Sequence, residues 1–331
     1  MHQVLRCRFL SGLGQVLLVT ALSLAGCGND SKQAPTRFTL RFAPSDGTEF
    51  VQKMSVTRIQ EISTGERITD RSKSQIHFVI EKTDFGYRVE ANQLESTTTR
   101  NGEPREDLVS KLLQEQRATY EVDPNGQVLA IRGFENISDR IATELPAELS
   151  EVLAPVLTEK FLVKRGKEEW GQRYGEFAGK TIEIGDIWES LPKTRIAGGG
   201  EVNRYTVTWF QKTRRCGEKH CVRVRIFYNS HLDALREELA TTLGERAEDL
   251  FKNIEATDPK AMGTEISGEI DRLVDPDTML PQMESELRVT TRVVTHPEQG
   301  TITLTITETK DYEFDYSGFQ PIARKLTNSP S

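Results

Sequence analysis

The stretch YTVTWFQKTRRCGEKHCVRVRIFY, residues 205–228, decides the fold class of this chain. Apolar and polar side chains alternate on both sides of its centre, where Val222 and Val224 alternate with Arg223 and Arg225. A period of two is typical of an antiparallel strand with one buried face and one face in water. The stretch therefore predicts a β-hairpin with its two cysteines opposite each other near the tip.

The same alternation recurs in several other segments of the chain. They include residues 38–42, 76–80, 87–91 and 302–306. Alternating segments spread over most of a chain indicate one large antiparallel sheet, here of about ten strands.

Helical spacing replaces this alternation in two regions. In the first, between Ile141 and Leu157, apolar residues recur at three and four positions, and Pro146 and Pro155 must kink or divide the helix. A short amphipathic segment follows, with three aromatic residues on one side: Trp170, Tyr174 and Phe177. We expect this region to pack as core against the sheet, and the alternative is that its apolar stripe lines a cavity.

The second helical region runs from residue 231 to about residue 254, and it opens with the capping residues Asn229 and Ser230. Two short motifs also occur twice: residues 47–50 resemble 185–188, and the Asp-Pro turn at 122–126 resembles that at 274–278. The sequence predicts an α+β fold in which a large, curved, half-barrel-like antiparallel sheet packs on helices. The repeated motifs fit two similar halves, although motifs this short also arise by chance.

The first residues of the chain have the parts of a secretory signal. Arg6 and Arg8 give a positive start, residues 9–25 are mostly apolar, and small residues precede Cys27. A lasting membrane span needs about 20 apolar residues, so this glycine-broken run is too short to be one. We therefore expect a cleaved export signal.

The end of this signal, Leu24-Ala25-Gly26-Cys27, resembles the lipobox of bacterial lipoproteins. The resemblance implies that a signal peptidase recognises the first three of these residues and removes residues 1–26. It also implies that the Cys27 thiol carries a diacylglycerol unit, which attaches the protein to a membrane. One acyl chain alone binds a membrane only marginally, so stable attachment requires more than one.

The resemblance also bears on location and domain boundaries. Gly28 stands where an aspartate often directs retention in the inner membrane, which implies the bacterial outer membrane, facing the periplasm. We expect residues 27–37 to be the lipidated N-terminus and a flexible tether, since they are small and polar. Residues 38–317 then form the folded domain, and residues 318–331 form a C-terminal tail.

The two remaining cysteines of the exported part, Cys216 and Cys221, flank the predicted hairpin turn. Close cysteines in an exported protein favour a structural disulfide. The alternative is a redox or metal site that includes His220, although metal sites need three or four ligands. The formal net charge of −7 argues against nucleic acid as a partner.

A second resemblance concerns the folded domain. Residues 273–281, LVDPDTMLP, look like the Asp-Pro-x-Thr-x-Leu-Pro turn of periplasmic lipoprotein carriers and related half-barrel proteins. Residues 185–188 and 123–129 also resemble an uncharacterised family of bacterial envelope β-proteins. These resemblances imply a curved antiparallel sheet around helices, in some members with an apolar pocket. The chain departs from the carriers in length and in its own lipidation, which argues against a shuttling role.

A search for catalytic motifs finds no His-Glu-x-x-His helix, no Gly-x-Ser-x-Gly elbow and no phosphate-binding glycine loop. We therefore predict no catalytic residues, no metal, no cofactor and no enzymatic activity. The first hypothesis is a lipid-anchored module that binds an apolar ligand or lipid. The second is a scaffold lipoprotein that binds an envelope protein, and the third is a hydrolase whose site has no sequence motif.

Overall fold

The computed structural model describes most of the folded domain. The described residues are 35–114, 116–155, 157–195, 201–247, 249, 264–296 and 300–316. The predicted lipobox, with its attachment residue Cys27, and the predicted C-terminal tail lie outside the described residues.

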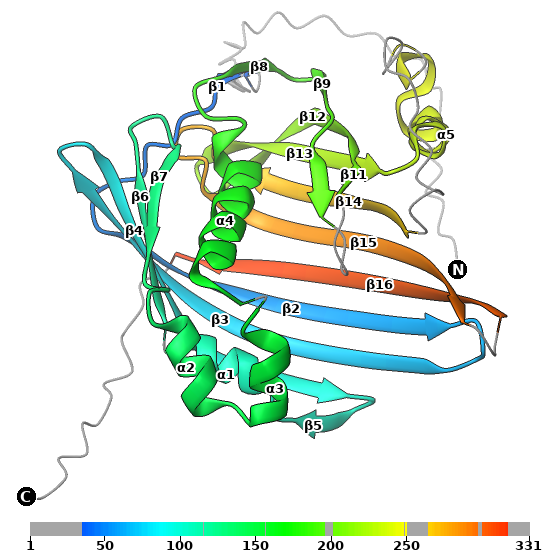
Figure 1. Ribbon diagram of the computed structural model, residues 1–331. Coiled ribbons are helices and arrows are strands. Elements are labelled where there is room, and N and C mark those ends of the chain that lie inside the picture. The colour runs from blue at the N-terminus through cyan, green and yellow to red at the C-terminus, as the bar shows by residue number, and fades with distance from the viewer. Residues whose placement is uncertain are drawn as a thin grey trace, which may run out of the picture. The chain divides into compact units, whose positions relative to one another are not determined.

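One open sheet of 12 antiparallel strands dominates the described residues (Figure 1). Its order is β7-β6-β4-β3-β2-β16-β15-β14-β13-β12-β9, and β5 pairs with β4. In this order the strands are β7 (Val128–Arg132), β6 (Arg117–Val122), β4 (Gly86–Arg100), β3 (Arg67–Thr83), β2 (Thr48–Ile62), β16 (Gly300–Asp315), β15 (Pro281–His296), β14 (Thr264–Val274), β13 (Lys219–Asn229), β12 (Tyr205–Cys216) and β9 (Ile187–Ser190), with β5 at Glu103–Arg105. The predicted α+β class with a large curved antiparallel sheet is confirmed, and the sheet has more strands than the alternating segments indicate.

Two short strand pairs lie outside this sheet. β1 (Arg37–Thr39) pairs with β8 (Thr181–Glu183), and β10 (Lys193–Arg195) pairs with β11 (Glu201–Asn203).

The strand order contains the same arrangement twice. β2, β3, β4, β6 and β7 are neighbours in one half, and β9, β12, β13, β14 and β15 are neighbours in the same direction in the other. In each half a helix follows the third of these strands, α1 (Leu108–Gln114) or α5 (Leu232–Leu243). The two similar Asp-Pro turns, at 122–126 and 274–278, each connect the fourth strand to the fifth. β16 pairs with both β15 and β2, and so connects the two halves.

Proline divides the first helical region as the sequence predicts. Pro146 is the N-cap residue that separates α2 (Ile137–Glu144) from α3 (Ala147–Leu153). α4 (Glu159–Trp170) follows and continues into a π-helical turn, η1 (Gly171–Gly175). The Thr158 side chain caps α4 by accepting a hydrogen bond from the Phe161 amide.

The second helix is shorter than predicted. α5 ends at Leu243 because Gly244 takes a φ of +60°, which favours glycine and stops the helix. A short 3₁₀ turn, η2 (Gly244–Ala247), follows. Most of the remaining predicted helix, to residue 254, lies outside the described residues.

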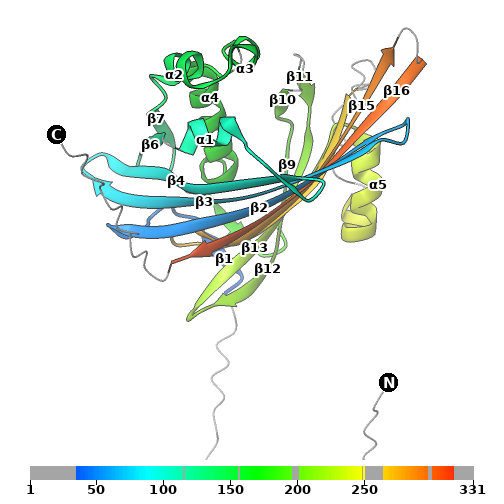
Figure 2. The same cartoon turned by 90° about the horizontal axis from the view of Figure 1, so that it is seen from below.

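Helices cover both faces of the sheet (Figure 2). α4 lies over the concave face, whereas α5 packs Leu235 and Leu239 against Phe227 on the opposite face. The core on the concave side contains all three residues of the predicted aromatic segment: Trp170, Tyr174 and Phe177. Core packing against the sheet is therefore confirmed for these segments.

The stripe on α2 and α3 departs from the prediction. Ile141 is fully buried, but it packs with Leu112 of α1 in a separate cluster of helices. Leu149 and Val152 of α3 are exposed, so other elements cover only part of the apolar side of α3. α1, α2 and α3 pack on one another, and α1 connects this group to the sheet through its contacts with β4.

The hairpin predicted for residues 205–228 is present as β12 and β13, with one difference in the register of its cysteines. Cys216 and Cys221 form the predicted disulfide, with their Cα atoms 5.9 Å apart. They lie diagonally rather than opposite each other, because Cys216 pairs with Lys219 and Cys221 pairs with Arg214. The cysteines are therefore committed to a structural cross-link, not to a thiolate metal site with His220.

Candidate functional site

The concave face changes character along its strands. Beneath α4 it is aromatic: the Trp170 indole donates to the Gly126 carbonyl oxygen at 2.9 Å and packs near Phe42 and Tyr120. Phe50 stacks on Phe78 with ring centroids 4.8 Å apart. This part of the face is filled core, so the candidate site lies further along the strands.

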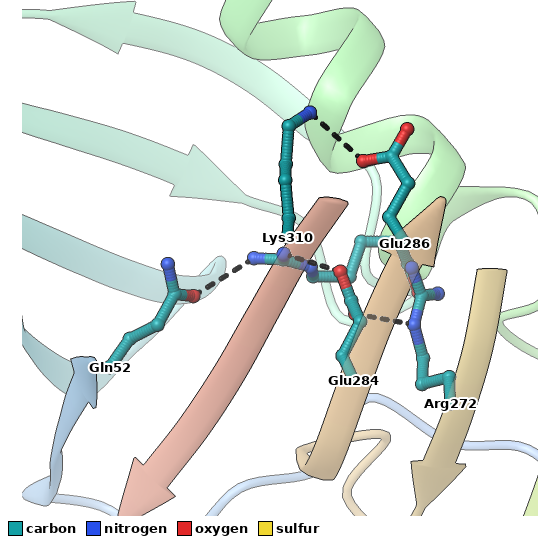
Figure 3. Close-up of polar contacts among 6 residues, drawn as sticks. Gln52, Arg272, Glu284, Glu286 and Lys310 are labelled. Carbon is teal, nitrogen blue, oxygen red and sulfur yellow. Dashed lines mark hydrogen bonds and ion pairs between the residues drawn. The ribbon is translucent and has the colours of Figure 1, made fainter. Parts of the chain in front are cut away.

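A row of charged residues, which we call the charged band, crosses the face next to this core. The band consists of Arg173, Arg272, Glu284, Glu286, Glu308 and Lys310. Glu284 of β15 is at its centre and is buried between two guanidinium groups (Figure 3). Its Oε1 accepts from Arg173 Nη2 at 2.8 Å, and its Oε2 accepts from Arg272 Nε at 2.6 Å.

Backbone and amide groups complete this arrangement. Arg173 Nη1 donates to the side-chain oxygen of Gln52 at 3.1 Å, and Arg272 Nη1 donates to the Arg173 carbonyl oxygen at 3.2 Å. Arg173 belongs to η1, whereas Gln52, Arg272 and Glu284 belong to β2, β14 and β15. The ion pair of Arg173 with Glu284 and its hydrogen bond to Gln52 therefore attach the end of the α4–η1 segment to strands of both halves of the sheet.

The electrostatics keep these groups charged. Burial acts to raise the pKa of Glu284, but Arg173 and Arg272 outweigh it and lower this pKa to about 2. Burial likewise opposes the charge on Arg173, but Glu284 raises the Arg173 pKa above its ordinary value. A general acid or base works best with a pKa near the operating pH. The central ion pairs are thus suited to fixed charge and not to proton transfer near neutrality.

The outer part of the band lies on β15 and β16. Lys310 Nζ is 2.9 Å from Glu286 Oε2 (Figure 3). It is also 3.1 Å from Glu308 Oε1. Burial acts to lower the pKa of Lys310, but the neighbouring carboxylates outweigh it, with Glu286 the strongest, and raise this pKa. The Tyr228 hydroxyl donates to Glu286 Oε1 at 3.2 Å, so Glu286 has two partners.

Apolar residues follow the charged band on the same face, toward one end of the strands. We call this group the apolar end: Ile62, Ile68, Val294, Ile302, Leu304 and Ile306. Leu304 pairs with Ile62, and Ile302 pairs with Val294. Every second residue of β16 from Lys310 to Ile302 shares one face, so the apolar end and the band belong to one surface. Val294 is 45% exposed, and the others are partly exposed.

The opposite face of the sheet has fewer exposed apolar residues grouped together. Met283, Leu287 and Val293 of β15 are exposed there, but their register partners on β16 are polar: Glu313, Thr309 and Thr303. Exposed apolar residues that are scattered singly are normal for a protein surface. We assign these residues no role.

The residues predicted from sequence and the residues of this face are different sets. The disulfide lies at the β12–β13 turn, and the lipobox is outside the described residues. His77 of β3 has a side chain only 16% exposed, and its Nε2 is 3.3 Å from Glu49 Oε2. Among the described residues, no three His, Cys, Asp or Glu side chains are grouped as metal ligands. No helix within the described ranges is long and apolar enough to cross a membrane.

The charged band was missed by sequence reasoning, although a signal for part of it exists. Glu284, Glu286 and Arg288 occupy alternate positions of one strand, so one face of that strand is charged over three successive positions. Such a strand indicates paired charges on a covered face. The partner Arg173 comes from a helical turn 111 residues away, and no local pattern identifies it.

Comparisons with known proteins find no matching family model and no matching curated protein. Among solved structures, lipovitellin, described by its lipid–protein interactions, is similar at 7% identity and a TM-score of 0.41, over 83% of this chain and 26% of that chain. DynF, from the dynemicin biosynthesis pathway of Micromonospora chersina, matches at 6% identity and a TM-score of 0.20, over 86% of this chain and 90% of that chain. The β domain of the Bordetella autotransporter BrkA matches at 8% identity and a TM-score of 0.24, over 80% of this chain and 99% of that chain. These likenesses carry no argument about function.

Proposed function

We propose that this protein is a lipid-anchored, non-enzymatic protein of the bacterial envelope that binds an amphipathic lipid on the concave face of its sheet. One observation carries the proposal: the charged band and the apolar end lie side by side on the same strands. On β16, Glu308 and Lys310 belong to the band, and Ile306 and Leu304 follow at the next positions of that face. A lipid has the same division into a polar headgroup and an apolar chain.

The energetic reason is the burial of apolar surface. An exposed or half-exposed aliphatic side chain gains roughly 25 cal/mol for each Å² of apolar area that a ligand removes from water. Leu304 with its partner Ile62, and Ile302 with its partner Val294, offer an acyl chain adjacent apolar side chains, beside which Thr290, Arg292 and Gln60 are the polar residues of the same face. The filled aromatic core beneath α4 provides the rigid support that a preformed binding face requires.

Replacement of Ile306 by asparagine tests this role, because it puts a polar amide where the apolar end meets the charged band. We expect the I306N chain to bind a monoacylglycerol labelled with nitrobenzoxadiazole about tenfold more weakly than the unmodified chain, since burial of an aliphatic side chain contributes roughly 1.5–3 kcal/mol. The measurement is a fluorescence titration of the purified full-length chain.

The matched control is T307N, which changes the next residue of β16 on the opposite face. It should bind the probe as the unmodified chain does. Probe binding that is absent from all three chains, or equal in all three, would contradict a lipid-binding concave face. Absence from all three would leave the scaffold hypothesis as the better account.

The membrane attachment has its own test at Cys27. The C27A chain should leave the membrane fraction or accumulate as an unprocessed precursor, because the thiol that accepts the diacylglycerol is gone. Membrane fractionation and intact-mass analysis measure both outcomes. A processed, membrane-bound C27A product would reject this acylation site, and C216S is the control cysteine variant that should keep the normal location.

A further inference from the structure

Two arginines beside the charged band make no ion pair with any described residue. Arg204 lies just before β12, and its guanidinium carbon is 4.9 Å from the centroid of the Tyr228 ring. Its Nε is buried without a hydrogen-bond partner within the described ranges. Arg288 lies on β15, two residues after Glu286 and on the same face.

Two nearby carboxylates, Glu286 and Glu308, have other partners, and a third, Glu176, attracts Arg204 without forming an ion pair with it. Glu286 accepts from Lys310 and from the Tyr228 hydroxyl. Glu308, which pairs with Arg288 in register, has its ion pair with Lys310 instead. Arg204 and Arg288 therefore carry two positive charges that no ion pair with a described residue neutralises, although the chain as a whole carries a net charge of −7.

Gly268 of β14 shapes the platform on which Arg204 stands. Gly268 pairs with Tyr228 on one side and with Arg288 on the other. A Cβ atom at Gly268 would lie 2.5 Å from the Tyr228 hydroxyl oxygen, so the absence of a side chain lets the Tyr228 ring lie across the sheet. The Tyr228 ring therefore packs against the Arg204 guanidinium, and its hydroxyl donates to Glu286 of the charged band.

The position of Arg204 is costly without an anion. Burial is the largest effect and lowers the Arg204 pKa below the ordinary arginine value; repulsion from Arg288 acts in the same direction, while Tyr228, Glu176 and Glu286 only partly offset it. A buried guanidinium with an unsatisfied N–H group costs free energy that an ionised acceptor would recover. The arrangement is that of an anion site whose acceptor does not come from the described residues.

We propose that Arg204 and Arg288 bind the phosphate of a lipid headgroup, at the junction of the charged band with the surface that holds the acyl chain. This inference rests on the proposed lipid-binding function. Phosphate is favoured over a fatty-acid carboxylate because two guanidinium groups from separate strands can each take different phosphate oxygens. A carboxylate has two oxygens, which a single guanidinium already satisfies.

Competition among three probes tests the inference on the purified full-length chain. The probes are 1-palmitoyl lysophosphatidic acid, monopalmitoylglycerol and inorganic phosphate, each used to displace the labelled monoacylglycerol. We expect lysophosphatidic acid to compete at least about tenfold better than monopalmitoylglycerol, since hydrogen bonds to charged groups are the strong ones. In R288Q this advantage should disappear, while the affinity for monopalmitoylglycerol stays unchanged.

R288K and R292Q serve as control variants. Lysine keeps the charge but loses the two-pronged geometry, so R288K should retain part of the advantage. R292Q changes an arginine two positions further along the same face, beyond Thr290, and should retain all of it. R204Q should repeat the R288Q result if circular dichroism shows that it folds.

An equal affinity for both palmitoyl probes, or an advantage that survives in R288Q, would overturn the phosphate subsite and leave chain binding intact. Calorimetry measures the binding of inorganic phosphate. If phosphate bound as tightly as lysophosphatidic acid, and if this binding depended on Arg288, the assignment to a lipid headgroup would be overturned. Failure of both palmitoyl probes to bind would reject the proposed function itself.

Discussion

Replacement of Glu284 by alanine is expected to lower the free energy of unfolding by about 3–5 kcal/mol, the usual effect of removing one partner of a buried ion pair. Glu284 is 5% exposed and is the carboxylate that both Arg173 and Arg272 contact. Without it, two guanidinium groups remain in the interior, and Gln52 is left as a neutral acceptor. Urea denaturation followed by circular dichroism measures the change.

The matched control is E61A. Glu61 forms an ion pair with Arg67 at 3.5 Å, but both side chains are more than half exposed, and such pairs contribute about 0–1 kcal/mol. A loss in E284A no larger than that in E61A would show that the buried ion pairs do not attach η1 to the sheet.

The pH dependence of the free energy of unfolding follows from the direction in which the Glu284 pKa changes on folding. The pKa of Glu284 is lowered from 4.5 to about 2 in the folded protein, so its stabilising contribution is complete above pH 4.5. That contribution is lost as the pH falls from 4.5 toward 2, where the folded protein must also take up the proton. We therefore expect E284Q to lose less stability than the unmodified chain over this interval. An identical acid profile for the two chains would contradict a buried, ionised Glu284.

Replacement of Trp170 by alanine should have an effect of similar size, about 3–5 kcal/mol, because it removes a large buried ring and leaves a cavity. Trp170 is 8% exposed and lies near Phe42, Tyr120 and Tyr174. Its ring joins the helix that covers the concave face to the sheet beneath it. Thermal and urea unfolding of W170A measure the loss.

Two further variants separate the contributions of the Trp170 side chain. W170F keeps an aromatic ring but loses the indole donor to the Gly126 carbonyl oxygen, which should cost about 1–3 kcal/mol. F85A is the control for an aromatic residue outside the core, since Phe85 is 83% exposed, and it should change stability by less than about 0.5 kcal/mol. Equal losses in W170A and F85A would contradict the packing described for α4.

The sheet was predictable because strand alternation is a local property. Val222, Val224 and Ile226 alternate with arginines over a short stretch, and that pattern requires no knowledge of the rest of the chain. Turn chemistry also acts locally: the Asp-Pro motifs at 122–126 and 274–278 mark corresponding turns of the two halves. The repeated strand order could therefore be anticipated from the echo between them.

Helix ends and the concave face were harder to predict, since they depend on tertiary contacts. Gly244 stops α5 although apolar residues continue the stripe beyond it, and the exposure of Val152 depends on how little α3 is covered. The charged band unites residues from η1, β14, β15 and β16, which only the tertiary fold brings together. Alternation identifies which residues share a face, but it does not identify the helix that lies over them.

The most direct test of lipid binding is to extract the non-covalently bound lipids from the full-length protein, purified from its native envelope, and to identify them by mass spectrometry. We predict a stoichiometric amount of an acyl-chain lipid with an anionic headgroup, strongly reduced in I306N and retained in T307N. The absence of any such lipid from the unmodified protein, or equal amounts in the two variants, would contradict the account.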